Sequence, residues 1–206
     1  MKSFREVKGV VFDMDGTLVL SDLDFARIRA EAEVPDGIPI LEFLEAADPS
    51  SRRKAERVLM EHEKRAAVEC TLQPGAEQVL EALRKRGLKL ALLTRNSRES
   101  VDQVVARFAM DFDVSIARED ARPKPSPEPV LKIAAALGLS PAELLVVGDY
   151  IFDVQAGRAA GSHTALLRTD KNGAFESEAE IVVDQLIELL DYLPARATTR
   201  AQQEAS

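Results

Sequence analysis

The chain has 206 residues and a formal net charge of -8, and 46% of its residues are hydrophobic. This composition fits a soluble globular protein with one substantial core, and it argues against nucleic-acid binding, which requires clustered basic residues. No apolar run approaches the roughly 20 residues that span a bilayer, and the first residues lack an apolar signal segment, so we expect a cytoplasmic protein without a membrane partner. The single cysteine, Cys70, excludes an internal disulfide and is expected to lie in the core.

The first predicted element is a buried strand at Val10 to Phe12, and a long interruption separates it from the next regular pattern. The interruption, Leu20 to Thr71, is rich in Glu, Arg, Ala and Leu and is predicted to be a small helical insertion. Because it directly follows the first strand, we expect it to lie over the carboxyl end of that strand. We assign residues 1–20 and 71–194 to the core, 21–70 to the insertion and 195–206 to a disordered tail.

Strand-like and helix-like segments alternate from about residue 70 onward. Short apolar runs predict buried strands, and apolar stripes between capping residues and glycines predict helices. The predicted order is helix Pro74 to Arg86, strand Leu88 to Leu93, helix Asn96 to Phe108, strand Phe112 to Ile116, helix Glu128 to Leu137, a capping box at Ser140 to Glu143, strand Leu144 to Val147, helix Ile151 to Ala160, strand Thr164 to Leu167, strand Ile181 to Val183 and a helix to about Tyr192. This alternation predicts an α/β fold, a Rossmann-like three-layer core with a parallel sheet.

Polar side chains follow several of the predicted strands at the point where each strand ends. They are Asp13 and Asp15 after the first strand, Thr94 after Leu93, Lys124 in a proline-rich loop, and Asp149 and Asp153 after the run LLVVG. Each signal alone is common, but ligand sites in open parallel sheets form outside the carboxyl ends of the strands. The combination therefore predicts a functional site at this edge of the sheet.

The charges of these side chains indicate a metal site. The four aspartates carry about -4 when all are ionised, and among these signals only Lys124 offsets them. Adjacent buried carboxylates repel one another and lose hydration. A hard divalent cation such as Mg2+ prefers oxygen ligands and would relieve both costs. The two histidines, His62 and His163, stand alone in the sequence, and we expect neither to be a ligand.

The four motifs, in this order, resemble those of the haloacid dehalogenase superfamily, whose members are mostly metal-dependent phosphatases. The resemblance covers nearly all of residues 8–190, and its motifs read DMDGT, LLTRN, RPKPSPE and GDYIFD. The insertion is similar to the helical cap that the family carries between its first two motifs. It is shorter than the caps of phosphoglycolate phosphatase-like members, the branch that the chain otherwise resembles.

The resemblance implies a role for each acidic residue. Asp13 is the expected nucleophile, which forms an aspartyl-phosphate with the substrate. Asp15 is expected to protonate the leaving alcohol and then to take a proton from the water that hydrolyses the intermediate. Mg2+ is expected to be held by Asp13, the backbone carbonyl of Asp15, Asp149 and Asp153.

The resemblance also implies how the phosphoryl group is bound. Thr94 and the following backbone amide are expected to hold phosphate oxygens, and Lys124 to neutralise charge on the nucleophile and the phosphoryl group. Gly16 lets the backbone approach the phosphate closely. Further substrate contacts are expected from Arg95, Asn96 and, in the cap, Arg27.

The implied function is Mg2+-dependent hydrolysis of a small phosphorylated metabolite, of the phosphoglycolate or sugar-phosphate class, by a monomer or homodimer. A phosphomutase resembling β-phosphoglucomutase shares every core motif and stays open as an alternative, as does a non-catalytic binding protein, which the intact motifs disfavour. A receiver-type phosphoacceptor domain is disfavoured because its acidic pair precedes its Thr and Lys. A dehalogenase is disfavoured because that branch lacks the second aspartate, here Asp15.

Overall fold

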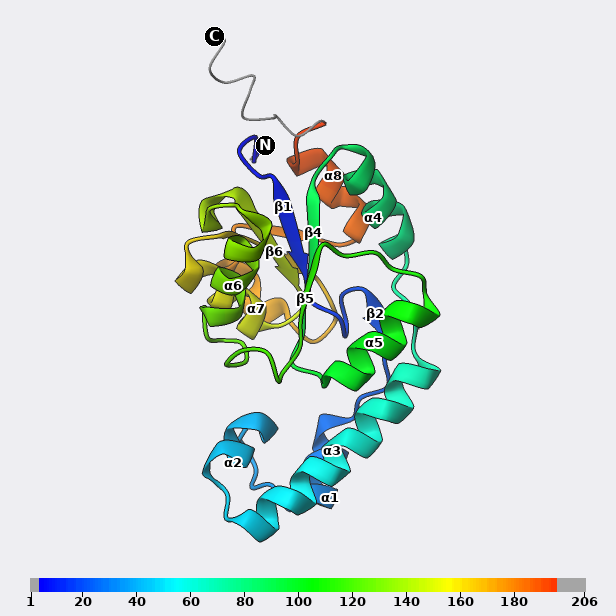
Figure 1. Ribbon diagram of the computed structural model, residues 1–206, viewed down its shortest axis with the longest axis vertical. Coiled ribbons are helices and arrows are strands. Elements are labelled where there is room, and N and C mark those ends of the chain that lie inside the picture. Colours follow the sequence, from blue (N-terminus) through cyan, green and yellow to red (C-terminus); the bar gives the residue numbers. More distant parts are fainter. Residues whose placement is uncertain (1–3, 196–206) are drawn as a thin grey trace.

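A six-stranded parallel sheet forms the centre of the computed structural model, which describes residues 4–195 (Figure 1). Its strands lie side by side in the order β5-β4-β1-β6-β7-β8. Their bounds are β1 (Gly9–Phe12), β4 (Lys89–Leu93), β5 (Val114–Ile116), β6 (Leu144–Gly148), β7 (His163–Leu167) and β8 (Ile181–Val183). The predicted α/β fold with a parallel sheet is confirmed. The predicted disordered tail, apart from residue 195, lies outside the described residues.

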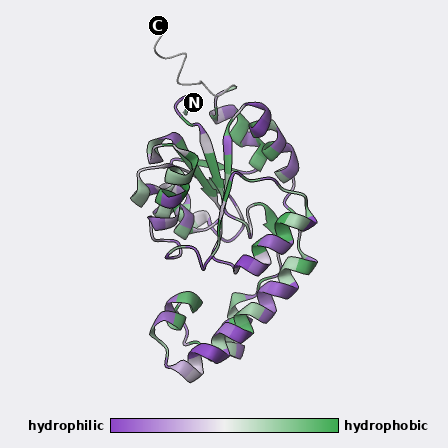
Figure 2. Ribbon diagram, viewed as in Figure 1, coloured by the Kyte–Doolittle hydropathy of each residue, from purple (hydrophilic) through white to green (hydrophobic). Residues whose placement is uncertain are grey.

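The strands are central because their apolar runs are buried on both faces of the sheet. β1 pairs with β4 on one side and β6 on the other, so that Phe12 lies opposite both Leu92 and Val147. Along β1, Val10 and Phe12 join the core on one face, while Val11 joins the core on the other. Figure 2 shows apolar residues concentrated on the central strands. Both faces of the sheet must therefore be covered by helices.

Helices cover each face of the sheet and complete the predicted three layers. Helices α4 (Ala76–Lys85), α5 (Arg98–Arg107) and α8 (Leu189–Tyr192) contribute to the core on one face, and α6 (Glu128–Leu137) and α7 (Ile151–Ala160) to the core on the other. Short 3-10 turns occupy Pro141–Glu143, Gly173–Glu178 and Leu186–Glu188. Within residues 4–195, every helix is too short or too polar to cross a membrane.

Three predicted helix starts differ from those observed. Helix α4 begins at Ala76, after an N-cap at Gly75, and not at the predicted Pro74. Helix α5 is capped by Ser97, whose Oγ accepts a hydrogen bond from the Ser100 amide, and not by Asn96. The reason is that the Asn96 side chain is already used, since its amide donates to Asp15. The predicted capping box between Ser140 and Glu143 is present, but it closes only a 3-10 turn because β6 begins at once.

Three helices interrupt the core between two short strands, β2 (Val19–Leu20) and β3 (Thr71–Leu72), which pair antiparallel and bring the ends of the insertion together. The helices are α1 (Phe25–Ala32), α2 (Ile40–Ala46) and α3 (Pro49–Glu69). They bury an apolar cluster of their own, which includes Ile28, Leu41 and Val58. In Figure 1 they lie beyond the carboxyl ends of the parallel strands. The insertion therefore lies on the side of the core to which the carboxyl ends of the parallel strands point.

Candidate active site

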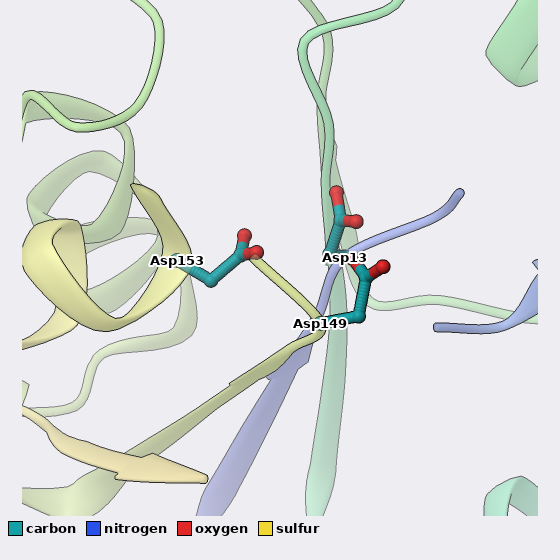
Figure 3. Close-up of side chains that lie close together, drawn as sticks. All are labelled: Asp13, Asp149 and Asp153. Carbon is teal, nitrogen blue, oxygen red and sulfur yellow. The ribbon is translucent and has the colours of Figure 1, made fainter. Parts of the chain in front are cut away.

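Three aspartate side chains meet where the neighbouring strands β1 and β6 end. Asp13 directly follows β1, Asp149 directly follows β6, and Asp153 lies in the first turn of α7. Each offers a carboxylate oxygen, and these oxygens all lie within 4.8 Å of one another (Figure 3). We call these three residues the acidic cluster. The cluster follows from topology, because parallel pairing of β1 with β6 brings their carboxyl ends together.

Two glycines permit this close approach. Gly16 has a φ of +77°, and a Cβ atom there would lie 2.2 Å from Asp149 Oδ2. A Cβ atom at Gly148 would lie 2.1 Å from Asp153 Cγ. Such distances are far inside van der Waals contact, so a larger residue at either position would displace a carboxylate of the acidic cluster.

Lys124 is the cation that the structure places against the acidic cluster. Its Nζ lies 2.5 Å from Asp13 Oδ1 and 2.5 Å from Asp153 Oδ1, and it donates a hydrogen bond to the Leu93 carbonyl at 3.0 Å. The side chain is only 3% exposed. Burial by itself lowers the pKa of Lys124, but the carboxylates of Asp13 and Asp153 outweigh burial and raise it. Lys124 is therefore charged at neutral pH.

One ammonium does not balance three carboxylates, and the protonation of the cluster shows this. Burial, followed by the neighbouring Asp153 carboxylate, raises the pKa of Asp149 to about 7. Burial also raises the pKa of Asp13 well above its usual range, although Lys124 opposes the shift. Ionisation of both Asp13 and Asp149 is therefore disfavoured without a further cation. Carboxylate oxygens at this spacing match the ligand preference of a hard divalent cation, so the residues fit the predicted metal.

Asp15 has a separate environment. Its Oδ1 accepts a hydrogen bond from Ser21 Oγ at 2.5 Å, and its Oδ2 accepts one from Asn96 Nδ2 at 2.7 Å. Burial raises the pKa of Asp15, although both hydrogen bonds lower it. The two donors fix the orientation of the carboxyl group, and the raised pKa suits a group that must carry a proton near neutral pH.

Thr94 and Asn96 follow β4, the neighbour of β1 on the side away from β6. Thr94 is buried, its amide donates to the Ile116 carbonyl at 3.1 Å, and its Oγ1 accepts from the Asn96 amide at 3.1 Å. These bonds shape the loop after β4, and the Asn96 side chain, which donates to Asp15, joins this loop to the one that carries Asp15. The structure thus brings Asp13, Asp15, Gly16, Thr94, Asn96, Lys124, Asp149 and Asp153 to one edge of the sheet.

Arg95 also lies at this edge, but it faces the insertion. Its guanidinium donates to the Lys124 carbonyl and lies over the Phe152 ring, with Cζ 4.8 Å from the ring centroid. On its other side it pairs with Glu42 of α2, with Nη2 2.7 Å from Glu42 Oε2. Arg95 therefore joins the core to the insertion.

Arg27 is not placed with these residues. It is exposed on α1, where its Nε pairs with Glu31 Oε1 at 2.7 Å, and within residues 4–195 the structure gives it no contact with the acidic cluster. The histidines also lie apart from the cluster, as predicted: His62 Nε2 is 2.8 Å from Glu31, and His163 Nε2 is 3.0 Å from Glu6.

Sequence reasoning missed three supporting residues. Ser21 holds Asp15, Glu42 holds Arg95, and Asn172 Nδ2 donates to the Asp149 carbonyl at 2.7 Å. Ser21 directly follows β2 and comes soon after the first motif in the chain, so its proximity to Asp15 was a usable signal. Glu42 and Asn172 lie far along the chain from their partners, and no local pattern marks them.

Comparisons with known proteins agree with this geometry. A family model described as haloacid dehalogenase-like hydrolase matches residues 7–161. The chain is 34% identical to a haloacid dehalogenase-like hydrolase domain-containing protein of Arabidopsis thaliana, over 82% of this chain and 73% of the relative. It is 28% identical to the N-acetylmuramic acid 6-phosphate phosphatase of Pseudomonas aeruginosa, over 94% of this chain and 97% of the relative. A solved hydrolase from Pseudomonas syringae shares the fold, with a TM-score of 0.75 and 24% identity over 90% of this chain and 96% of that one.

Proposed function

We propose that this chain, which belongs to the haloacid dehalogenase-like hydrolases and is a phosphatase, hydrolyses a small phosphorylated metabolite with Mg2+ as its cofactor. The observation that carries the proposal is the acidic cluster with Lys124 against it and the separately held Asp15 beside it. This arrangement provides a carboxylate nucleophile, a second carboxyl group for proton transfer and positive charge for a phosphoryl group.

The proposed metal ligands are Asp13, Asp149, Asp153 and the backbone carbonyl of Asp15. A bound divalent cation supplies positive charge that offsets the repulsion between a carboxylate and a phosphoryl dianion. Lys124 contributes in the same direction, because its ammonium contacts Asp13 and is held by the Leu93 carbonyl.

The proposed reaction has two steps. An Asp13 oxygen attacks phosphorus, the bond to the leaving oxygen breaks, and Asp15 gives its proton to that oxygen, which leaves as an alcohol. Water then attacks the aspartyl-phosphate, Asp15 takes a proton from this water, and the acyl-phosphate P–O bond breaks to release inorganic phosphate and Asp13. Both carboxyl groups end in their starting states. The raised pKa of Asp15 supports its role as the acid.

The remaining edge residues are proposed to bind substrate. Thr94, together with the amide of Arg95, is positioned to hold phosphoryl oxygens, Asn96 orients Asp15, and Gly16 keeps the backbone close. Residues 21–70 would act as a cap on a core of 1–20 and 71–194. Arg27, which pairs with Glu31 on an exposed face, receives no support as a substrate ligand from this arrangement.

A small metabolite is the proposed substrate class, either phosphoglycolate-like or a sugar phosphate. Support comes from the position of residues 21–70 beyond the strand ends (Figure 1) and from the Pseudomonas aeruginosa relative, which is named for a phosphorylated amino sugar acid. Such an enzyme would act in the cytoplasm, as a monomer or homodimer, with neither nucleic acid nor membrane as partner.

A phosphate-release screen over a panel of phosphorylated metabolites tests the proposal. We expect one or a few compounds to release phosphate in the presence of Mg2+, and we expect EDTA to abolish the release. The Asp13→Asn variant serves as the control for contaminating phosphatases. Full activity in EDTA would refute the metal assignment, and a sugar phosphate that is isomerised without release of phosphate would indicate a phosphomutase instead.

A further inference from the structure

A single ion pair joins Arg95, next to the proposed phosphate-binding Thr94, to Glu42 in the first turn of α2. Arg95 Nη2 lies 2.7 Å from Glu42 Oε2 and 3.0 Å from Glu42 Oε1. The Arg95 side chain is 20% exposed and that of Glu42 is 39% exposed. The pair therefore lies at the boundary between the core and the cap, because Arg95 belongs to the loop after β4 and Glu42 belongs to α2.

Two contacts with the core hold one side of Arg95. One terminal nitrogen donates to the Lys124 carbonyl, and the guanidinium lies over Phe152, the residue before Asp153 of the acidic cluster. Both contacts belong to the motifs of the proposed active site. Arg95 thus directs its other terminal nitrogen, Nη2, toward the cap, where it donates to both carboxylate oxygens of Glu42.

A leaving group attached to a phosphoryl group at Asp13 must lie between the strand ends and the cap, beside Thr94 and therefore near Arg95. An arginine with a free edge there would attract a second anionic group on the substrate. Here Glu42 already takes that place, and its own negative charge repels a second anion. A neutral, hydroxyl-bearing leaving group needs no free arginine edge, and the charge of Glu42 does not repel it.

We propose that Glu42 is a specificity-determining residue, which neutralises Arg95 and so selects substrates with a neutral leaving group over substrates with a second anionic group. The inference rests on the proposed phosphatase function and narrows it to the sugar-phosphate class rather than the phosphoglycolate class. The substrate class that this inference identifies is a phosphomonoester of a neutral polyol.

The test compares two substrates that differ only in this respect, 2-hydroxyethyl phosphate and 2-phosphoglycolate. We expect Glu42→Gln to raise the ratio of kcat/KM for 2-phosphoglycolate to kcat/KM for 2-hydroxyethyl phosphate by about tenfold or more, the size of a charge-assisted hydrogen bond. Glu45→Gln is the matched control, because Glu45 lies on the same helix and is exposed. That variant is expected to leave the ratio unchanged.

If Glu42 only held the cap in place, Glu42→Gln would change both substrates by the same factor, and an unchanged or lower ratio overturns the inference. A wild-type protein that hydrolyses neither compound counts against the proposed function instead. In that case the rise in Tm that each compound produces is compared between Asp13→Asn and the double variant Asp13→Asn, Glu42→Gln. A preferential gain for 2-phosphoglycolate in the double variant supports the role of Glu42, and its absence overturns it.

Discussion

Asp13 and Asp15 lie two positions apart, yet their environments are different. Asp13 faces Lys124 and two other carboxylates, whereas Asp15 accepts hydrogen bonds from Ser21 and Asn96. The first environment suits a nucleophile that works beside cations, and the second suits a group that exchanges a proton. The turn after Asp15 contributes to this difference. The Gly16 amide donates a hydrogen bond to the Val19 carbonyl at 2.8 Å, and the chain beyond this turn brings Ser21 to Asp15.

The nucleophile assignment predicts the behaviour of Asp13→Asn. An amide at this position is a poor nucleophile, so phosphate release should fall by at least about a thousandfold. The fold should persist, since the amide can still accept a hydrogen bond from Lys124. Phosphate release by the purified variant, together with its circular dichroism spectrum, checks the prediction. Substantial residual turnover by a clean preparation would refute the assignment.

The acid and base assignment predicts a different defect for Asp15→Asn. With p-nitrophenyl phosphate the leaving group needs no proton, so the first step should proceed while hydrolysis of the aspartyl-phosphate stalls. We expect a burst of one p-nitrophenolate per enzyme and a steady-state rate lower by about 100- to 10,000-fold. Stopped-flow absorbance measures both quantities. An unchanged kcat, or a loss without a burst, contradicts the assignment.

At the scale of the element, helix α3 is fixed to the core through a buried carboxylate. Glu63 is 2% exposed, and its two oxygens lie 2.6 and 3.1 Å from the Arg118 guanidinium, while the Ser97 amide donates to it at 3.2 Å. Burial raises the pKa of Glu63, and Arg118 opposes that shift. Because Arg118 and Ser97 belong to loops after β5 and β4, this contact attaches the longest helix of the cap to the edge of the sheet.

Glu63→Gln should therefore destabilise the protein. Removing Glu63 leaves the Arg118 charge with only the half-exposed Glu119, 3.8 Å away, as an ion-pair partner in the described part of the chain. We expect a loss of about 2 to 3 kcal/mol, because Arg118 also keeps some access to water. Urea unfolding measures the loss as a lower midpoint at an unchanged slope. Glu61→Gln is the control: Glu61 lies on the same helix in an exposed pair with Arg57 and should cost less than about 0.5 kcal/mol. Equal effects of the two changes would contradict the role given to Glu63.

The elements also show which features a sequence reveals. Most of the parallel strands were predictable because they are apolar runs, and Asp13, Thr94 and Asp149 were predictable because each directly follows such a run. Lys124 lies in the proline-rich loop between β5 and α6 and was marked by its place among the motifs. The two-residue strands β2 and β3 carry no periodic signal. The Arg95 to Glu42 pair joins residues 53 positions apart, and only the path of the cap brings them together. Partners across such distances depend on packing, which no local pattern encodes.

For the whole molecule, the proposed metal site at the acidic cluster predicts that metal binding changes the stability of the fold. In the metal-free protein the pKa of Asp149 is raised from 3.8 to about 7. The folded state favours the protonated form of Asp149. The contribution of this protonation to the free energy of unfolding is therefore complete below about pH 4 and is lost as the pH rises through 7. The metal-free protein should therefore lose stability across this window, by at most about 1.4 kcal/mol per pH unit from this group.

Mg2+ should reverse that trend, because it requires the ionised carboxylate and competes with the proton. At a concentration about 100 times its Kd, a ligand of the native state contributes about 2.7 kcal/mol, which corresponds to a rise in Tm of roughly 5 to 10 °C for a chain of this length. We expect the rise to be full at pH 8 and to shrink toward pH 6. Differential scanning fluorimetry at several pH values, with Mg2+ or with EDTA, measures it.

Asp149→Asn should abolish most of the rise and flatten the pH dependence of the metal-free protein, since asparagine neither ionises nor matches a carboxylate as a ligand. A rise in Tm that is the same at every pH, or that survives in Asp149→Asn, would show that the cation binds elsewhere.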